Sequence, residues 1–225
     1  APRANEAVYV TGASQAPLFS YAGTVAQNLH SIIVKETYTG RVVFQPLFAE
    51  GFSQTLNIQD RLDVLGGSLA LTANVTSTVA AEGVTINAKS VYVGENAKIH
   101  SDGLGFPGGQ GPARSGGASH GGRGEDTQYC AEYGDPNAPI TCGTAGSEGD
   151  GDAWSVGGQF SGGSVKLDVG EGTVTVDGKI SCNGETDVGH SAGAGGSIWI
   201  VCGDFKGAPT GRLTAIGGST GWDSA

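Results

Sequence analysis

Apolar and polar residues alternate along several short stretches of the chain, with valine or isoleucine at every second position. The clearest stretches are 90–93 (SVYV) and 173–176 (TVTV). A period of two puts successive side chains on opposite faces of an extended strand, so each stretch predicts a short β-strand with one apolar face. Glycine-bearing turns separate the stretches, and we expect no helices between them. Further stretches of this kind are 7–10, 31–34, 41–44 and 84–86.

Two phrases repeat within this pattern, and both share one period. The first is Gly-Gly-Ser followed by alternating apolar residues, at 66–71, 162–167 and 195–200, with a truncated copy at 217–219. The second has a basic residue, an aliphatic residue and a closing glycine, at 98–103, 179–184 and 212–217. Between their last two copies both phrases advance by 33 residues, from 162 to 195 and from 179 to 212. A shared period indicates units that stack on one another.

We therefore predict an all-β chain that forms a right-handed, single-stranded parallel β-helix, with the strands of successive coils stacked in parallel. The alternative is a β-sandwich, which needs no exact internal period. Residues 1–60 are poorer in glycine and richer in aromatic residues. We expect them to form an irregular N-terminal β segment that caps the solenoid, and residues 61–225 to form the β-helix itself.

A long glycine-rich insertion interrupts the repeat at about 104–161, where the later unit has only the loop 185–194. Both loops place histidine beside serine and glycine. Glycine permits close backbone approach, so we expect the two loops to pack side by side with their imidazoles hydrogen-bonded to backbone. The predicted loop-contact residues are His120, Arg123 and His190. The alternative for the two histidines is a metal or catalytic role.

Three carboxylates alternate with glycine inside the insertion, at Glu148, Asp150 and Asp152. Glycine between them allows several oxygens to converge on one hard cation, so calcium is the candidate cofactor. The complete EF-hand loop and the tandem nonapeptide calcium repeat are both absent from the sequence. The alternative is an acidic loop in contact with solvent.

Four cysteines, Cys130, Cys142, Cys182 and Cys202, lack the C-x-x-C spacing of zinc sites. An even number of cysteines in an acidic chain without methionine suits an oxidising compartment, so we expect two disulfides. Local closure favours Cys130–Cys142 and Cys182–Cys202, with other pairings and free thiols as alternatives. Asn74 begins the one Asn-x-Thr sequon and is the predicted N-glycosylation site.

The formal net charge of −10 argues against a nucleic-acid partner, because binding to phosphate backbones is driven by Lys and Arg. No apolar run reaches the roughly 18 to 20 residues that a bilayer requires, so we expect no membrane insertion of this segment. The absence of methionine, even at position 1, favours a processed segment. Together with the cysteines, these features predict an extracellular location, either secreted or at the cell surface.

The phrases GGSIWI at 195–200 and GASHGGRG at 117–124 resemble those of glycine-rich extracellular and cell-surface proteins of the pectin-lyase-like β-helix group. The resemblance covers about residues 60–225 and implies a right-handed parallel β-helix in a surface, adhesive or filament-forming protein. It supplies no catalytic residues. The sequence also lacks an Asp-Asp pair, a nucleophile-elbow Gly-x-Ser-x-Gly before a helix and a Walker loop.

The predicted function is an extracellular structural or adhesive module, without enzymatic activity, that assembles end to end into a homo-oligomer or filament. A glycan is the other candidate partner. The alternative function is a polysaccharide-binding or polysaccharide-cleaving β-helix, acting as a lyase or hydrolase. Trp199, Trp222, Tyr129 and Tyr133 are candidate contact aromatics in either case.

Overall fold

The computed structural model of the chain is all-β, with sixteen strands in three sheets and no helix among the residues it describes. Those residues are 6–11, 18–21, 29–46, 54–73, 75, 81–112, 118–121, 132–146, 159–186 and 192–219. Every strand pair in the three sheets is parallel. This pairing confirms the predicted parallel β-solenoid and excludes the β-sandwich, whose sheets are antiparallel.

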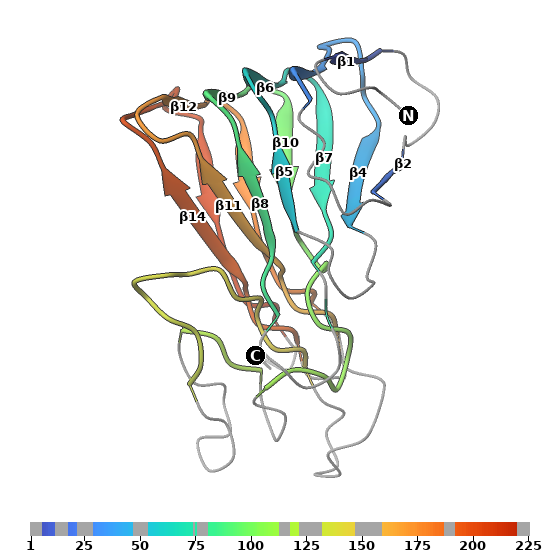
Figure 1. Cartoon of the computed structure of the whole chain (residues 1–225). Helices are drawn as coiled ribbons and strands as arrows, with labels where there is room; N and C mark the ends of the chain where they lie inside the picture. The colour runs from blue at the N-terminus through green and yellow to red at the C-terminus, as the bar shows by residue number, and fades with distance from the viewer. Residues whose placement is uncertain are drawn as a thin grey trace.

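From β3 onward the chain visits the three sheets in turn, once per coil (Figure 1). Sheet 1 contains, in spatial order, β1 (Ala7–Val10), β3 (Ser31–Val34), β6 (Arg61–Val64), β9 (Ser90–Val93), β12 (Thr173–Val176) and β15 (Asp204–Lys206). Sheet 2 contains β2 (Leu18–Tyr21), β4 (Arg41–Pro46), β7 (Gly67–Leu71), β10 (Ala97–His100), β13 (Lys179–Ser181) and β16 (Arg212–Thr214). Sheet 3 contains β5 (Thr55–Asn57), β8 (Val84–Asn87), β11 (Ser164–Asp168) and β14 (Ser197–Val201).

Aliphatic side chains at equivalent positions of successive coils stack in ladders that form one continuous core. In sheet 1 the register aligns Ile32, Leu62, Val91, Val174 and Phe205. In sheet 2 it aligns Val42, Leu69, Ile99, Ile180 and Leu213. Below the last coil these ladders are buried, because the period-two alternation places their apolar residues on the inward face. Strands before residue 60 therefore belong to the same sheets and the same core as those after it.

The 33-residue repeat in the sequence corresponds to direct strand pairing in space. Val165 of β11 pairs with Ile198 of β14, and Ile180 of β13 pairs with Leu213 of β16. Earlier coils are slightly shorter, since the side-chain hydrogen bond from Asn87 to Asn57 spans 30 residues. The repeat is thus one coil of the solenoid.

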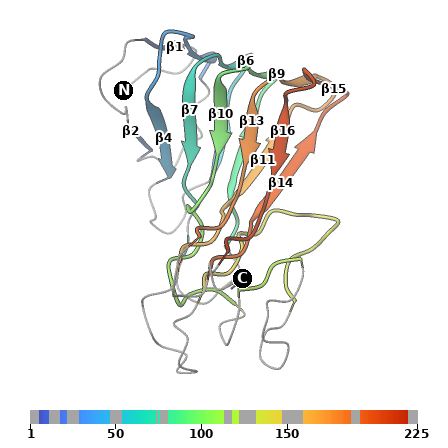
Figure 2. The ribbon, with the colours of Figure 1, turned by 180° about the vertical axis from the view of Figure 1, so that it is seen from behind.

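The long connections all lie at one corner of the coil, between sheet 2 and sheet 3. The insertion joins β10 to β11, and residues 182–196 join β13 to β14 at the same corner. Figures 1 and 2 show these loops gathered on one side of the stack. A second small core joins the insertion to the β7–β8 connection. Phe106, Cys142 and Ala145 of the insertion pack there with Ala73, Val75 and Ala81.

The predicted disulfides are wrong, because Cys142, Cys182 and Cys202 all carry free thiols and only Cys130 lies outside the described residues. The amide of Gly196, just before β14, donates a hydrogen bond to the backbone carbonyl of Cys182 at 2.7 Å. Cys202 lies at the other end of β14, directly after its last residue. The extended strand between these points is on the order of 15 to 20 Å long, far beyond the roughly 7 Å limit between the Cα atoms of a disulfide. Closeness in sequence did not bring the two thiols together.

Candidate functional sites

Two features of the structure are candidate functional sites, and the first is the last coil of the solenoid. β14, β15 and β16 are each the outermost strand of their sheet. Figure 2 shows them together at the end of the stack opposite β1 and β2. Among the described residues, each of the three pairs with the preceding coil alone, so its other edge presents backbone groups to a further strand.

The core of this terminal coil is uncovered. Phe205 is 54% exposed and Leu213 is 45% exposed, although their ladder neighbours one coil below, Val174 and Ile180, are 0% exposed. Ile198 and Ile200 of β14 are also only partly buried. Beside β14 and β16 there is a hollow of about 320 Å³, lined by Ile198, Ile200, Leu213, Thr214 and Ala215.

At the opposite end of the solenoid, the inward residues of β1 are less exposed than Phe205 and Leu213. Val10 is 7% exposed, and Val8 is partly buried. Tyr9 is exposed, but it alternates with the inward residues Val8 and Val10 and therefore points outward. Among the side chains that the structure describes, the apolar surface that the ladders leave open is thus concentrated at the C-terminal coil.

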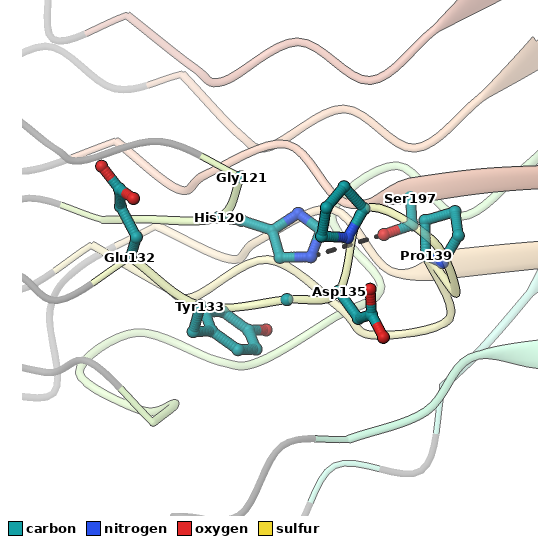
Figure 3. A pocket seen from close by; sticks show the side chains of 9 residues that line it. His120, Gly121, Glu132, Tyr133, Asp135, Pro139 and Ser197 are labelled. Carbon is teal, nitrogen blue, oxygen red and sulfur yellow. Dashed lines mark hydrogen bonds between the residues drawn. The ribbon is translucent and has the colours of Figure 1, made fainter.

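The second candidate site is a pocket of about 400 Å³ between the insertion and the start of β14. Figure 3 shows His120 at its centre, with Glu132 and Asp135 on either side. A volume of this size suits a small ligand. The lining residues are His120, Gly121, Glu132, Tyr133, Gly134, Asp135, Pro136, Pro139 and Ser197.

Hydrogen bonds and a ring contact fix the position of His120. Its Nε2 lies 3.0 Å from Thr141 Oγ1 and 3.4 Å from Ser197 Oγ. Ser197 Oγ in turn donates to the carbonyl of Thr141 at 2.8 Å. The Tyr133 ring packs against the imidazole at a centroid distance of 5.0 Å. Three separate segments of the chain therefore meet at this one side chain.

Glycine at position 134 makes room for the imidazole. Its φ of +99° lies in a region that residues with a side chain rarely adopt. A Cβ at this position would also lie 3.0 Å from His120 Nε2. Gly134 thus meets two requirements at once, a backbone turn and close packing against the histidine.

Burial lowers the pKa of His120 below its usual range, and backbone hydrogen bonds with Gly196 and Gly195 oppose that shift only in part. The imidazole is therefore neutral at pH 7. Burial also raises the pKa of Tyr133 far above its usual value, so the phenol is neutral as well. The formal charge of the pocket lining comes from the carboxylates of Glu132 and Asp135.

Of the predicted site residues, His120 is placed in the pocket, and its backbone partners Gly195 and Gly196 directly follow the shorter glycine-rich loop. Thr141 and Ser197 were missed, because their partnership with His120 depends on contacts 21 and 77 residues away in sequence. In the part of the chain that the structure describes, no group of His, Cys, Asp and Glu is arranged to hold a metal ion. Arg123, His190, Asn74, Glu148, Asp150 and Asp152 lie outside the described residues.

No family model, curated protein or solved structure matches this chain. The fold itself therefore defines its class, which is an all-β parallel β-solenoid with a glycine-rich insertion at one corner. No helix within the described ranges is long and apolar enough to cross a membrane.

Proposed function

We propose that the protein is a structural module of an extracellular assembly, and that its uncovered terminal coil stacks on the first coil of a second copy. The observation that carries this proposal is the exposed end of the core ladders at Phe205 and Leu213. The proposal treats the solenoid as an element that extends by repetition and performs no chemistry.

Burial of apolar side chains supplies the driving force. Full burial of a Leu or Phe side chain stabilises by about 1.5 to 3 kcal/mol relative to exposure. Phe205 and Leu213 each keep about half of their surface in water, and Ile198 and Ile200 add to the same surface. A coil placed over them would continue ladders that are 0% exposed one coil below, at Val174 and Ile180.

The free strand edges favour head-to-tail stacking. Sheet 1 ends in β15 at one end and in β1 at the other, and sheet 2 ends in β16 and β2. All the strands are parallel. A second copy translated along the solenoid axis would therefore place its β1 beside β15 and its β2 beside β16, in the hydrogen-bonding pattern that joins successive coils of one chain. A head-to-tail contact that does not close into a ring generates an open filament.

The extracellular location rests on the resemblance to surface proteins, on the Asn74 sequon and on the acidic composition. Free thiols at Cys142, Cys182 and Cys202 remove the disulfide argument for it. Burial raises the pKa of Cys142 to about 12 and that of Cys182 well above its usual value, so neither thiol is reactive in the folded chain.

Replacement of Phe205 by aspartate tests the proposed assembly. We expect the wild-type chain to associate with increasing concentration in analytical ultracentrifugation and to form rods in electron micrographs. Phe205→Asp should weaken association at least tenfold, because it places a charge in the apolar contact. The matched control is Phe160→Asp, at a phenylalanine of similar exposure (43%) that lies outside the terminal coil, and it should associate like wild type.

Two results would overturn the proposal. One is a wild-type chain that stays monomeric at the highest soluble concentration. The other is a discrete dimer that does not grow further, because it would indicate a closed contact between two like ends. Equal association of Phe205→Asp and Phe160→Asp would show that chains associate through a different surface.

A further inference from the structure

The outer face of sheet 2 carries a straight row of basic side chains. Because successive residues of a strand point to opposite faces, the residue before each inward position of the sheet 2 ladder points outward. Strand pairing aligns five such residues on β4, β7, β10, β13 and β16, which Figure 2 shows side by side. They are Arg41, Ser68, Lys98, Lys179 and Arg212, and we call them the cationic row. Neighbouring strands are about 4.8 Å apart, so the row runs along the solenoid axis for roughly 20 Å.

Few carboxylates offset the charge of the cationic row. None of the six strands of sheet 2 contains Asp or Glu. Asp102, which follows β10, forms an ion pair with Lys98. Across the described ranges, no ion pair joins Arg41, Lys179 or Arg212 to a carboxylate. Arg41 and Arg212 are exposed and Lys179 is partly exposed, so this face keeps their positive charges although the chain has a net charge of −10.

The neighbouring histidine responds to the positive field of this face. His100 lies two residues after Lys98, on the outward side of β10. Burial lowers its pKa to about 4, and the positive charges of Lys98, Arg41 and Lys179 lower it further than the carboxylate of Asp102 raises it. The imidazole is therefore neutral at pH 7, and the charge that an approaching ligand meets comes from lysine and arginine.

We propose that the outer face of sheet 2 binds a linear sulfated polysaccharide that lies along the cationic row. A straight row with a nearly constant step matches a linear polymer that repeats its negative charges. A sulfate group has three acceptor oxygens, so a single group can accept hydrogen bonds from basic side chains of two adjacent coils, such as Lys179 and Arg212. The guanidinium groups of Arg41 and Arg212 add bidentate pairing with oxyanions.

The shape of this surface favours a polysaccharide over other polyanions. An extended acidic peptide gains its affinity by pairing with a free strand edge, whereas β4, β7, β10 and β13 are paired on both edges. Stable attachment to an anionic membrane needs apolar or lipid anchors beside the basic residues, and this row supplies charge alone. The face is also separate from the uncovered core of the terminal coil, so the proposal does not depend on end-to-end stacking.

Calorimetric titration with dextran sulfate, at a protein concentration where the chain is monomeric, tests the proposal. We expect saturable binding that weakens as salt is added, and no binding of uncharged dextran. Lys179→Gln combined with Arg212→Gln should weaken binding at least tenfold. The matched control, Arg61→Gln combined with Lys89→Gln, removes two exposed positive charges on the side of sheet 1 and should bind like wild type.

Three results would overturn the proposal. The first is no binding of dextran sulfate, or equal weakening in both double variants, because the latter would indicate a response to overall charge. The second is binding of polygalacturonate, whose charges are carboxylates, as tight as that of dextran sulfate. The third is binding to phosphatidylserine vesicles that the Lys179→Gln/Arg212→Gln chain loses, because it would assign this face to a membrane. The Phe205→Asp chain should bind dextran sulfate like wild type, which separates this surface from the assembly contact.

Discussion

Gly196→Ala should lower the free energy of unfolding by about 3 kcal/mol, which corresponds to a fall in Tm of about 6 to 12 °C for a chain of this size. An added Cβ at this position would lie 1.7 Å from the carbonyl oxygen of Gly163 in the coil below. The obstacle is backbone in a paired coil, so relief requires the two coils to separate locally. Thermal and urea unfolding monitored by circular dichroism would measure the change.

Gly217→Ala is the matched control, because it lies in the truncated copy of the same phrase. A Cβ there would meet nothing closer than 3.8 Å, and its φ is not positive. We expect a change within about 0.5 kcal/mol, or a slight gain from reduced freedom in the unfolded chain. Equal stability of the two variants would contradict the close stacking of the Gly-Gly-Ser turns.

Ile180→Ala should cost about 2 to 5 kcal/mol of stability, whereas Leu213→Ala should cost less than about 1 kcal/mol. The two residues occupy the same ladder in adjacent coils, but Ile180 is 0% exposed and Leu213 is 45% exposed. The cavity that alanine leaves is therefore enclosed in one variant and open to solvent in the other. Urea unfolding at low protein concentration, where copies do not associate, measures both.

The ratio of these two effects is the informative result. A Leu213→Ala chain as unstable as Ile180→Ala would mean that the terminal coil is already covered within a single chain. Two small effects would mean that neither side chain belongs to a stacked core.

Much of the fold could be predicted from local sequence, because each coil repeats the same physical requirements. Inward positions must be apolar, so the alternation in β9 and β12 predicted both strands and their burial. The recurrence at 33 residues predicted stacked units, and in the structure Ile180 pairs with Leu213, which occupies the equivalent place in the next copy of the phrase. A solenoid is predictable in this way because its long-range contacts repeat a local pattern.

The residues that precede the closing glycine of the second phrase have a role that the sequence analysis did not predict. Asp102 accepts a hydrogen bond from the amide of Asn183 at 2.7 Å, and Asn183 Oδ1 accepts one from the amide of Ile216 at 3.0 Å. These three residues occupy equivalent positions in successive copies of the phrase. The polar side chains thus link each coil to the next at one corner, a role visible only once the register is known.

Neither the pocket nor the free state of the thiols was predicted from the sequence, for different physical reasons. Cys182 lies at an inward position equivalent to Ser101, so its thiol belongs to the core. His120 meets Ser197 only because the insertion folds back onto the start of β14. Such contacts depend on how an irregular loop packs, and neither alternation nor spacing encodes that.

A cysteine pair placed across two coils tests the stacked solenoid most directly. Lys98 and Lys179 are 81 positions apart in sequence but are direct neighbours in the parallel pairing of β10 with β13. Neighbouring strands are about 4.8 Å apart, within the range of a disulfide. Mass spectrometry after mild oxidation should therefore show a Lys98→Cys/Lys179→Cys chain cross-linked, and a Lys98→Cys/Lys166→Cys chain, with its cysteines on different sheets, not cross-linked. Failure of the first pair in a folded chain, or equal cross-linking of both pairs, would contradict the parallel stack.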